Sequence, residues 1–563
     1  MKKFIFLFGI IFIVSCSELD LNPLSAGSSE NWYSNQTEFN LALNDLYREY
    51  LWATEVSYRT ERYSDNWNQR LTQYAFPGGT IASDWSDAES NWVNFYKGIS
   101  RANSIINNLH EIENNVLAEE FRNRYEAEAR FMRATFYGTL VFLYGDVPYF
   151  TKYLDIEEAF NIGRTNKETI LPFIYEDFDF AAEYLPEVYG SGELKRATKG
   201  AAYAMKARIA LYVSDWEVVK SAAEDCINLG VYSLHPDFGE YFLSSTKNSD
   251  ETIFAIPRSQ QLNSSWSPRS WLPRNVGGTS TAQPSWELFY SFLATDGLPV
   301  DESPLFDPKE PFKNRDPRLA ETIVPFGNVH LGVVYDPHPN SEMVLNVNTG
   351  SMIQNKDTRS VDIYAAYNGL TLKKGVDEDW LDQIVDNDII IMRYADVLLM
   401  KAEADIELNE IDESTLNAIN QVRARAYGVD EAEVLEYPSV QIISQSELRT
   451  ILRTERRVEL AWENRRFADL IRWRLAEVAL TRPVYGLLDP IELREQIVDK
   501  GLWFLPEIPE IDENGLVDFS SLFDQGLIRK HVERNFDPKR QYLWPIPFKE
   551  TQINPNISQN PYY

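Results

Sequence analysis

The chain has few of the residues on which metal sites and disulfide-stabilised folds depend. Among 563 residues there are two cysteines and five histidines. Cys16 lies in an N-terminal leader, so a single cysteine is left for the folded part and a disulfide framework is excluded. Cys226 lies in a predicted helix and is expected to be a small buried apolar group. No two histidines have the HExxH spacing of a zinc protease, and the sequence predicts neither a metal site nor a cofactor.

Signatures of catalysis are also missing. The chain contains no GxSxG nucleophile elbow, no GxxxxGK[ST] phosphate loop and no GxGxxG dinucleotide motif. A pair of carboxylates suited to glycoside hydrolysis could be chosen from 85 Asp and Glu residues by chance alone. We therefore expect a protein that is not an enzyme, with a surface glycoside hydrolase as the least favoured alternative.

Positive charge is scarce. Lys and Arg total 54 against 85 Asp and Glu, which gives a formal net charge of −31. Nucleic acids and anionic lipid surfaces are bound through basic patches, so neither is expected as the main partner.

Long apolar runs are absent except at the N-terminus. Lys2 and Lys3 precede an apolar run from Phe4 to Val14, which is too short to span a membrane and typical of a secretory signal. The run ends in Ile-Val-Ser-Cys, which resembles a bacterial lipobox. We predict a signal peptide at 1–15, lipidation of Cys16 and a tether at 16–36; an ordinary signal peptide that ends near a cysteine is the alternative. The lipid is the membrane contact that we expect.

The strongest helical pattern covers residues 391–408. Ala395, Leu399, Ala402 and Ile406 follow one another at helical spacing, and further apolar residues widen this face. A helix that is apolar on so many sides is typically buried between other helices. Arg393 and Asp396 lie one turn apart and are expected to form a buried ion pair.

Further helices are predicted along both halves of the chain. They cover 37–52 with Thr37 as N-cap, 90–112, 119–150, 167–186, 198–216, 217–230, 414–428 and 446–473. Several form pairs close to the tetratricopeptide length without its strict spacing. The predicted fold is all-α, with tetratricopeptide-like helical hairpins, a large irregular loop-rich region and a few short strands such as Thr252–Ile256.

This pattern divides the folded chain into three parts. We predict an N-terminal helical part at 37–230, a loop-rich insertion at 231–385 and a C-terminal helical part at 386–563. Irregular segments of such length usually serve a function, so the insertion is expected to contribute to a ligand-binding face.

A dense series of charges marks residues 453–469. Glu455, Glu459 and Glu463 recur every four residues among several arginines. An anion site is one interpretation, and we favour a structural ion network that joins this helix to its neighbours.

Large aromatic residues on loops are the best functional signal. Flat rings on loops are typical platforms for sugar rings, and neighbouring amides and arginines can hold hydroxyls or carboxylates. The candidate ligand-binding residues are Trp67, Asn68, Arg70, Tyr74, Trp85, Trp266, Trp271 and Arg274. The alternative is that each tryptophan anchors its own loop to the helical body. Trp286 has helical spacing with Phe289 and is expected to be core.

The chain resembles the SusD/RagB family of bacterial nutrient-uptake lipoproteins from end to end. The matching stretches are WVNFYKGISRANSII, YEAEARFMRATFYGTLVFLYGDVPYF, RATKGAAYAMKARIALY, RDPRLAETI, IIIMRYADVLLMKAEA, LNAINQVRARAYG, RTERRVELAWENRRFADLIRW and the terminal LWPIP…INPNISQNPYY. The resemblance implies an all-α body with tetratricopeptide-like pairs and a position on the outer membrane, exposed at the cell surface. It also implies binding of a glycan, without catalysis, and delivery to a SusC-like TonB-dependent transporter. Ligand contacts are expected from the loops at 63–86 and 257–275.

Two alternatives stay open. The RagB branch of the family binds peptide instead of glycan. A protein-interaction scaffold at the outer membrane, built on the helical pairs, would hold no small ligand.

Overall fold

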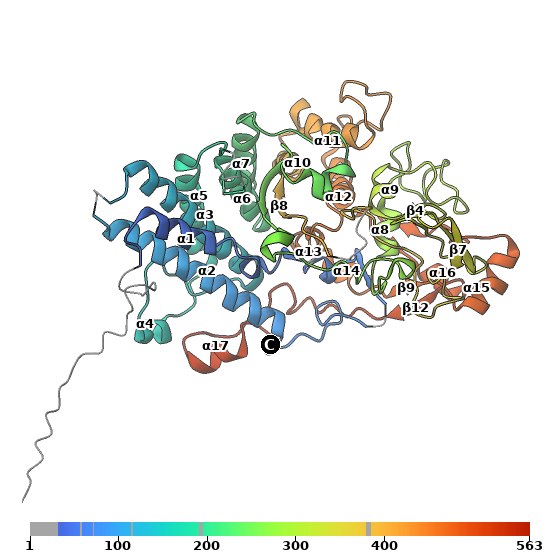
Figure 1. Ribbon diagram of the computed structural model, residues 1–563, viewed down its shortest axis with the longest axis horizontal. Coiled ribbons are helices and arrows are strands. Elements are labelled where there is room, and N and C mark those ends of the chain that lie inside the picture. Colours follow the sequence, from blue (N-terminus) through green and yellow to red (C-terminus); the bar gives the residue numbers. More distant parts are fainter. Residues whose placement is uncertain (1–31, 57–58, 71, 114–115, 191–194, 379–383) are drawn as a thin grey trace, which may run out of the picture.

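The computed structural model describes residues 32–56, 59–70, 72–113, 116–190, 195–378 and 384–563. Cys16, the predicted signal peptide and most of the predicted tether lie outside these residues. In Figure 1, helices α1 to α7 gather at one end of an elongated molecule and strands β4, β7, β9 and β12 lie at the other, whereas β8 lies with α10 to α12 between them. The predicted fold class is confirmed, because the chain is mostly helical with few short strands.

The N-terminal helices pack closely because small residues lie where they cross. The helices are α1 (Gln36–Asp45), α2 (Ser86–Glu111), α3 (Glu119–Tyr144), α4 (Ile156–Asn161), α5 (Lys167–Tyr184), α6 (Lys199–Tyr212) and α7 (Trp216–Asn228). A Cβ placed on Gly98 would lie 2.4 Å from the Phe136 ring, and one on Gly138 would lie 2.7 Å from Ile209. Neither position has room for a larger residue without a shift of its neighbour.

Both predicted hairpins are present. Helix α6 packs on α7, with Ser214 in the left-handed region between them and Gly230 in that region after α7. Helix α10 (Tyr394–Leu408) packs on α11 (Glu413–Ala426), and Gly428 follows with φ 68°. Glycine adopts this conformation without the steric cost that a Cβ imposes.

Several predicted helix boundaries are wrong. The helices expected at 37–52 and 119–150 end early, at Asp45 and Tyr144. Residues 391–393 belong to strand β8 (Ile389–Arg393), which pairs with the predicted strand β2 (Thr252–Ile256), so α10 begins only at Tyr394. Asn35, not Thr37, caps α1 by accepting a hydrogen bond from Glu38 N. The segment 446–473 forms two helices, α12 (Gln445–Glu459) and α13 (Arg466–Arg472), because the chain turns sharply at 460–465.

The insertion and the C-terminal segment contain short elements joined by long loops. These are β3 (Ala282–Pro284), α8 (Trp286–Ser291), α9 (Arg318–Thr322), β4 (Val329–His330), β5 (Val333–Val334), β6 (Met343–Asn346), β7 (Ser351–Gln354), α14 (Ala476–Ala479), β9 (Val484–Gly486), α15 (Pro490–Gln496), β10 (Glu510–Ile511), β11 (Val517–Asp518), α16 (Ser520–Asp524), β12 (Arg529–Val532) and α17 (Phe548–Ile553). The N-terminal part contributes the short strand β1 (Trp67–Gln69). Strands β4 to β7 form an antiparallel sheet in chain order, and the others pair in twos, including β1 with β3.

Two large apolar clusters stabilise the molecule. One lies among the N-terminal helices and includes Cys226, and the other includes Trp286 of α8 and the C-terminal segments around it. Both residues are buried as predicted. No helix in the described part of the chain is long and apolar enough to cross a membrane.

Candidate functional site

Four tryptophans bring the two predicted ligand loops together. Trp67 stacks on Trp462 with ring centroids 4.7 Å apart and planes at 22°. Trp462 meets the edge of Trp271 at 6.1 Å, and Trp271 lies 4.7 Å from Trp266. Pairing of β1 with β3 fixes Trp67 opposite Pro284. This tryptophan cluster therefore joins the loop at 63–86 to the loop at 257–275.

Two of these rings have the burial expected of loop anchors, the alternative to an open platform. Trp67 and Trp271 are 7% and 4% exposed, so neither presents a ring face to a ligand. Asn68 is also buried, and its side chain donates to Gln283 Oε1 at 3.0 Å. Burial among other rings removes a large apolar area from water, which outweighs exposure on a loop. These three residues anchor their loops.

Trp85 belongs to a different aromatic group. It packs against Tyr63, Phe76 and Trp544, with centroid distances of 5.6, 6.1 and 4.7 Å. The ring is half-buried and sits at the N-terminus of α2. The structure thus does not bring Trp85 together with the other candidate tryptophans.

Trp266 lies at the outer end of the cluster, beside a pocket that has charged residues in its lining. The pocket encloses about 660 Å³, counting open solvent, and Trp266, Arg258, Lys374 and Glu463 are among its lining residues. The Arg258 guanidinium carbon is 5.5 Å from the Trp266 ring centroid and its Nη2 pairs with Glu49 Oε1 at 2.6 Å. Burial lowers the pKa of Lys374 to about 8, against the opposing effect of Glu463.

The candidate residues Arg70 and Arg274 both lie beside the ring of an exposed tyrosine, Tyr364. Tyr364 is 47% exposed, and the guanidinium carbons of Arg70 and Arg274 lie 5.1 and 5.9 Å from its ring centroid. Arg70 Nη1 donates to the carbonyl oxygens of Thr279 (2.6 Å) and Tyr364. Arg274 pairs with Asp362 at 3.1 Å. We call Arg70, Arg274, Asp362 and Tyr364 the Tyr364 patch.

Burial and neighbouring charges shift the pKa values of groups in and beside this patch. Burial, and then the like charge of Arg274, lower the pKa of Arg70. Arg274 N donates to Asp357 Oδ1 at 2.6 Å, and burial raises the pKa of Asp357 to about 7. The patch therefore holds two cations beside one exposed ring, the partly exposed Arg274 and the largely buried Arg70, with a single ion-paired carboxylate.

Tyr74 lies beside the cluster and is half-buried. Its ring centroid is 6.3 Å from that of Trp67, and the Arg62 guanidinium carbon lies 4.8 Å from it. Of the eight predicted residues, Tyr74, Trp85, Trp266 and Arg274 thus keep part of their surface, whereas Trp67, Asn68, Arg70 and Trp271 are buried.

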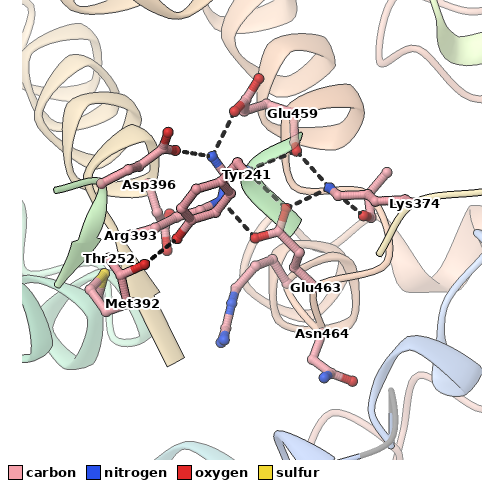
Figure 2. Close-up of polar contacts among 12 residues, drawn as sticks. Tyr241, Thr252, Lys374, Met392, Arg393, Asp396, Glu459, Glu463 and Asn464 are labelled. Atoms are coloured by element: carbon pink, nitrogen blue, oxygen red, sulfur yellow. Dashed lines mark hydrogen bonds and ion pairs between the residues drawn. The ribbon is translucent and has the colours of Figure 1, made fainter. Parts of the chain in front are cut away.

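The charge series in α12 forms a buried ion network, as predicted. Glu459 is fully buried and accepts from Arg393 at 2.6 Å, from Arg318 at 2.8 Å and from Arg425. Figure 2 shows Arg393 and Lys374 both reaching Glu463, at 2.7 and 2.6 Å. Each charge is matched by an opposite charge, so the network joins α12, β8 and the insertion.

The predicted ion pair between Arg393 and Asp396 is wrong. Both side chains are buried, but Arg393 pairs with Glu251, Glu459 and Glu463. Asp396 pairs with Arg208 at 2.6 Å and Arg456 at 3.0 Å. The residues separate because Arg393 ends strand β8 whereas Asp396 lies in the first turn of α10.

Sequence reasoning missed two residues of the site. The helical pattern of 446–473 predicts a continuous helix through Trp462, whereas this residue has φ 62° in the turn between α12 and α13. Tyr364 lies between Ile363, which is 67% exposed, and Ala365 in an irregular segment without periodicity. No grouping of three or more metal-ligand side chains occurs among the residues for which the structure gives side chains.

Comparison with known proteins identifies the family. The model described as the SusD family matches residues 242–563, which is more than half of the chain, and the model described as starch-binding associating with outer membrane matches 25–211. The chain belongs to the SusD family.

Individual relatives align with this chain over nearly its whole length. The SusD-like protein P2 of Formosa agariphila is 26% identical and the match covers 100% of this chain and 99% of the relative. The crystal structure of a SusD-like carbohydrate binding protein from Bacteroides fragilis has a TM-score of 0.75 at 28% identity, covering 93% of this chain and 99% of the other. A laminarin binding SusD-like protein has a TM-score of 0.61 at 21% identity, covering 94% and 100%, and supports the fold alone.

Proposed function

We propose that this protein binds a glycan at the cell surface, without catalysis, and delivers it to a SusC-like TonB-dependent transporter for uptake. The observation that carries the proposal is the Tyr364 patch, where an exposed ring lies between two arginines on loops that the tryptophan cluster holds in place. Rings and arginines in this arrangement are suited to sugar C–H faces and hydroxyls. Trp266 and the pocket beside it extend the proposed ligand face.

The family supports the ligand class. The related proteins named above include ones described as carbohydrate binding and laminarin binding. Peptide binding, as in the RagB branch, is the second candidate for the same face, because arginines also hold peptide carboxylates. A protein-interaction scaffold without a small ligand is the third, and no observation on the loops favours it.

The location and the partner belong to the same proposal. Lipidation of Cys16 would hold the chain at the outer membrane, in agreement with the family description of association with that membrane. We retain the division at residues 230 and 385, because the insertion carries both Trp266 and Tyr364.

Variants of the patch test the proposal. Isothermal calorimetry of the purified chain against a panel of neutral and acidic oligosaccharides and tripeptides should show saccharide binding. Tyr364→Ala should weaken it about fivefold or more, because an aromatic contact contributes about 0.5–1.5 kcal/mol beyond burial. The matched control is Tyr562→Ala, which removes a ring that is 72% exposed outside the patch. Binding of peptides alone, or equal affinities of both variants and wild type for every saccharide, would contradict the proposal.

A further inference from the structure

A large open groove runs along α2. It encloses about 1290 Å³, counting the solvent at its mouth. One wall is α2, and the others are residues 148–154, α4 and the C-terminal segment with Glu550 and Ile557. Figure 1 shows α4 and α17 on the same side of the molecule as α2. None of its lining residues belongs to the tryptophan cluster or to the Tyr364 patch.

Aromatic rings line this groove. Tyr96 and Phe150 stack with planes at 12° and centroids 5.9 Å apart, and both are half-buried. The Tyr96 hydroxyl donates to Pro148 O at 2.7 Å, which fixes its ring. Tyr153 is 77% exposed at the same groove. Large rings left partly open to solvent in a concave site are suited to an apolar ligand face.

The rim of the groove is basic. Lys97, Arg101 and Lys152 line it, and within the part of the chain that the structure describes Lys97 has no ion-pair partner. Lys152 pairs with Glu158 at 2.7 Å and Arg101 with Asp45 at 2.9 Å, all through exposed or partly exposed side chains. The exposed Lys152–Glu158 pair contributes little to stability, so Lys152 can turn to a ligand at small cost. Arg101 also donates to the Tyr50 hydroxyl and lies 5.7 Å from the centroid of that ring, so it lines the groove as a positive charge held in place.

These cations stand out against the rest of the chain. The protein carries a net charge of −31, yet three basic residues face one groove whose acidic lining residue is Glu550. Burial, and then the neighbouring Glu89, raise the pKa of Glu550. The groove is thus complementary to negative charge, unlike the surface as a whole.

We propose that this groove is a second binding site, which takes an anionic oligosaccharide. Carboxylate or sulfate groups would contact Lys97, Arg101 and Lys152, and the C–H faces of the sugar rings would lie on Tyr96, Phe150 and Tyr153. The choice of a saccharide rests on the proposed glycan-binding function. The site itself is independent of the loop face.

Calorimetry with charged and neutral probes of equal length tests the proposal. The probes are hexagalacturonate and laminarihexaose, titrated into the full folded chain at low and at physiological salt. Wild type should bind hexagalacturonate more tightly, with an affinity that falls as salt rises. Lys97→Glu should weaken this binding about fivefold or more at low salt, and Tyr153→Ala by a similar factor at both salt concentrations.

Two controls separate this site from the loop face. Lys313→Ala removes a different exposed, ion-paired lysine and should leave binding of hexagalacturonate unchanged. Tyr364→Ala should also leave the affinity of the groove for hexagalacturonate unchanged, whereas it should weaken binding of the ligand at the loop face. Equal affinity for both probes, no binding of hexagalacturonate, or unchanged affinity in Lys97→Glu and Tyr153→Ala would overturn the second site. Loss of binding in Tyr364→Ala alone would leave only the loop-face proposal standing.

Discussion

Glu459 carries a full negative charge in the interior because three cations surround it. Its side chain has no exposed surface, and its oxygens contact Arg318, Arg393 and Arg425. The arginines, with Arg425 first, hold the pKa of Glu459 well below its usual range against the effect of burial. The free-energy cost of burying these four charged groups is offset by their mutual attraction only while all four are present.

Removal of this one charge should therefore destabilise the protein strongly. In Glu459→Gln, three buried guanidinium groups lose their shared counter-charge, and we expect the free energy of unfolding to fall by about 3–5 kcal/mol. Urea denaturation followed by tryptophan fluorescence measures the change. The control Glu495→Gln alters an exposed glutamate in α15 and should change stability by less than about 0.5 kcal/mol. A loss in Glu459→Gln no larger than in the control would refute the structural role of the network.

At the scale of elements, the junction of α12 and α13 determines where the tryptophan cluster forms. Trp462 and Asn464 both have φ 62° there, so the chain reverses within a few residues. Asn464 Oδ1 accepts from the backbone N of Thr60 and Glu61, at 3.0 and 3.1 Å. This amide ties the junction to the segment that leads into Trp67.

Two substitutions at Asn464 separate its two contributions. Asn464→Gly keeps the left-handed backbone but loses the buried hydrogen bonds, and should cost about 1–3 kcal/mol. Asn464→Ala loses the bonds and adds the strain of a Cβ, so it should be less stable than the glycine variant by about 1 kcal/mol. Thermal and urea unfolding of the pair provide the measurement. An alanine variant as stable as the glycine variant would show that the backbone conformation is not what limits this position.

Sequence periodicity predicted most helices because their stabilising pattern is local. Residues 198–230 and 394–428 form the expected hairpins, and 453–469 supplies the expected ion network. The predicted helix boundaries were wrong where contacts with a distant segment override the local pattern. Ile391 belongs to a strand that pairs with residues near 255. The helix predicted at 446–473 breaks where Trp462 stacks on Trp67. The same distant contacts explain the site, since burial of a loop tryptophan depends on partners hundreds of residues away.

At the scale of the whole molecule, several carboxylates are buried away from water. Arginines hold the pKa values of Asp65, Asp396, Glu459 and Glu463 below their usual range, against the effect of burial. A carboxylate whose pKa is lower in the folded chain contributes stability above its unfolded pKa of about 4, and that contribution is lost as the pH falls further. Burial also lowers the pKa of His531 to about 4, so its contribution, present above about 6.5, is lost as the pH falls through about 4.

Glu61 and Asp357 change the free energy of unfolding in the opposite direction, and they do so over a different pH range. Burial raises the pKa of Glu61 and of Asp357 to about 7. Their contribution is complete below their unfolded pKa of about 4 and is lost as the pH rises through about 7. Below about pH 4 they are protonated in both the folded and the unfolded chain, so they cannot offset the loss from the arginine-paired carboxylates.

The free energy of unfolding should therefore drop steeply between about pH 4.5 and pH 3, where each arginine-paired carboxylate contributes up to about 1.4 kcal/mol per pH unit. Urea midpoints at pH 5, 4 and 3 measure this drop. Glu459→Gln should show a shallower decline over the same interval, because one of the titrating groups has been removed and the introduced amide carries no charge at any pH. A wild-type midpoint that stays constant from pH 5 to pH 3, or a variant that declines as steeply as wild type, would show that the buried network is not the source of the acid sensitivity.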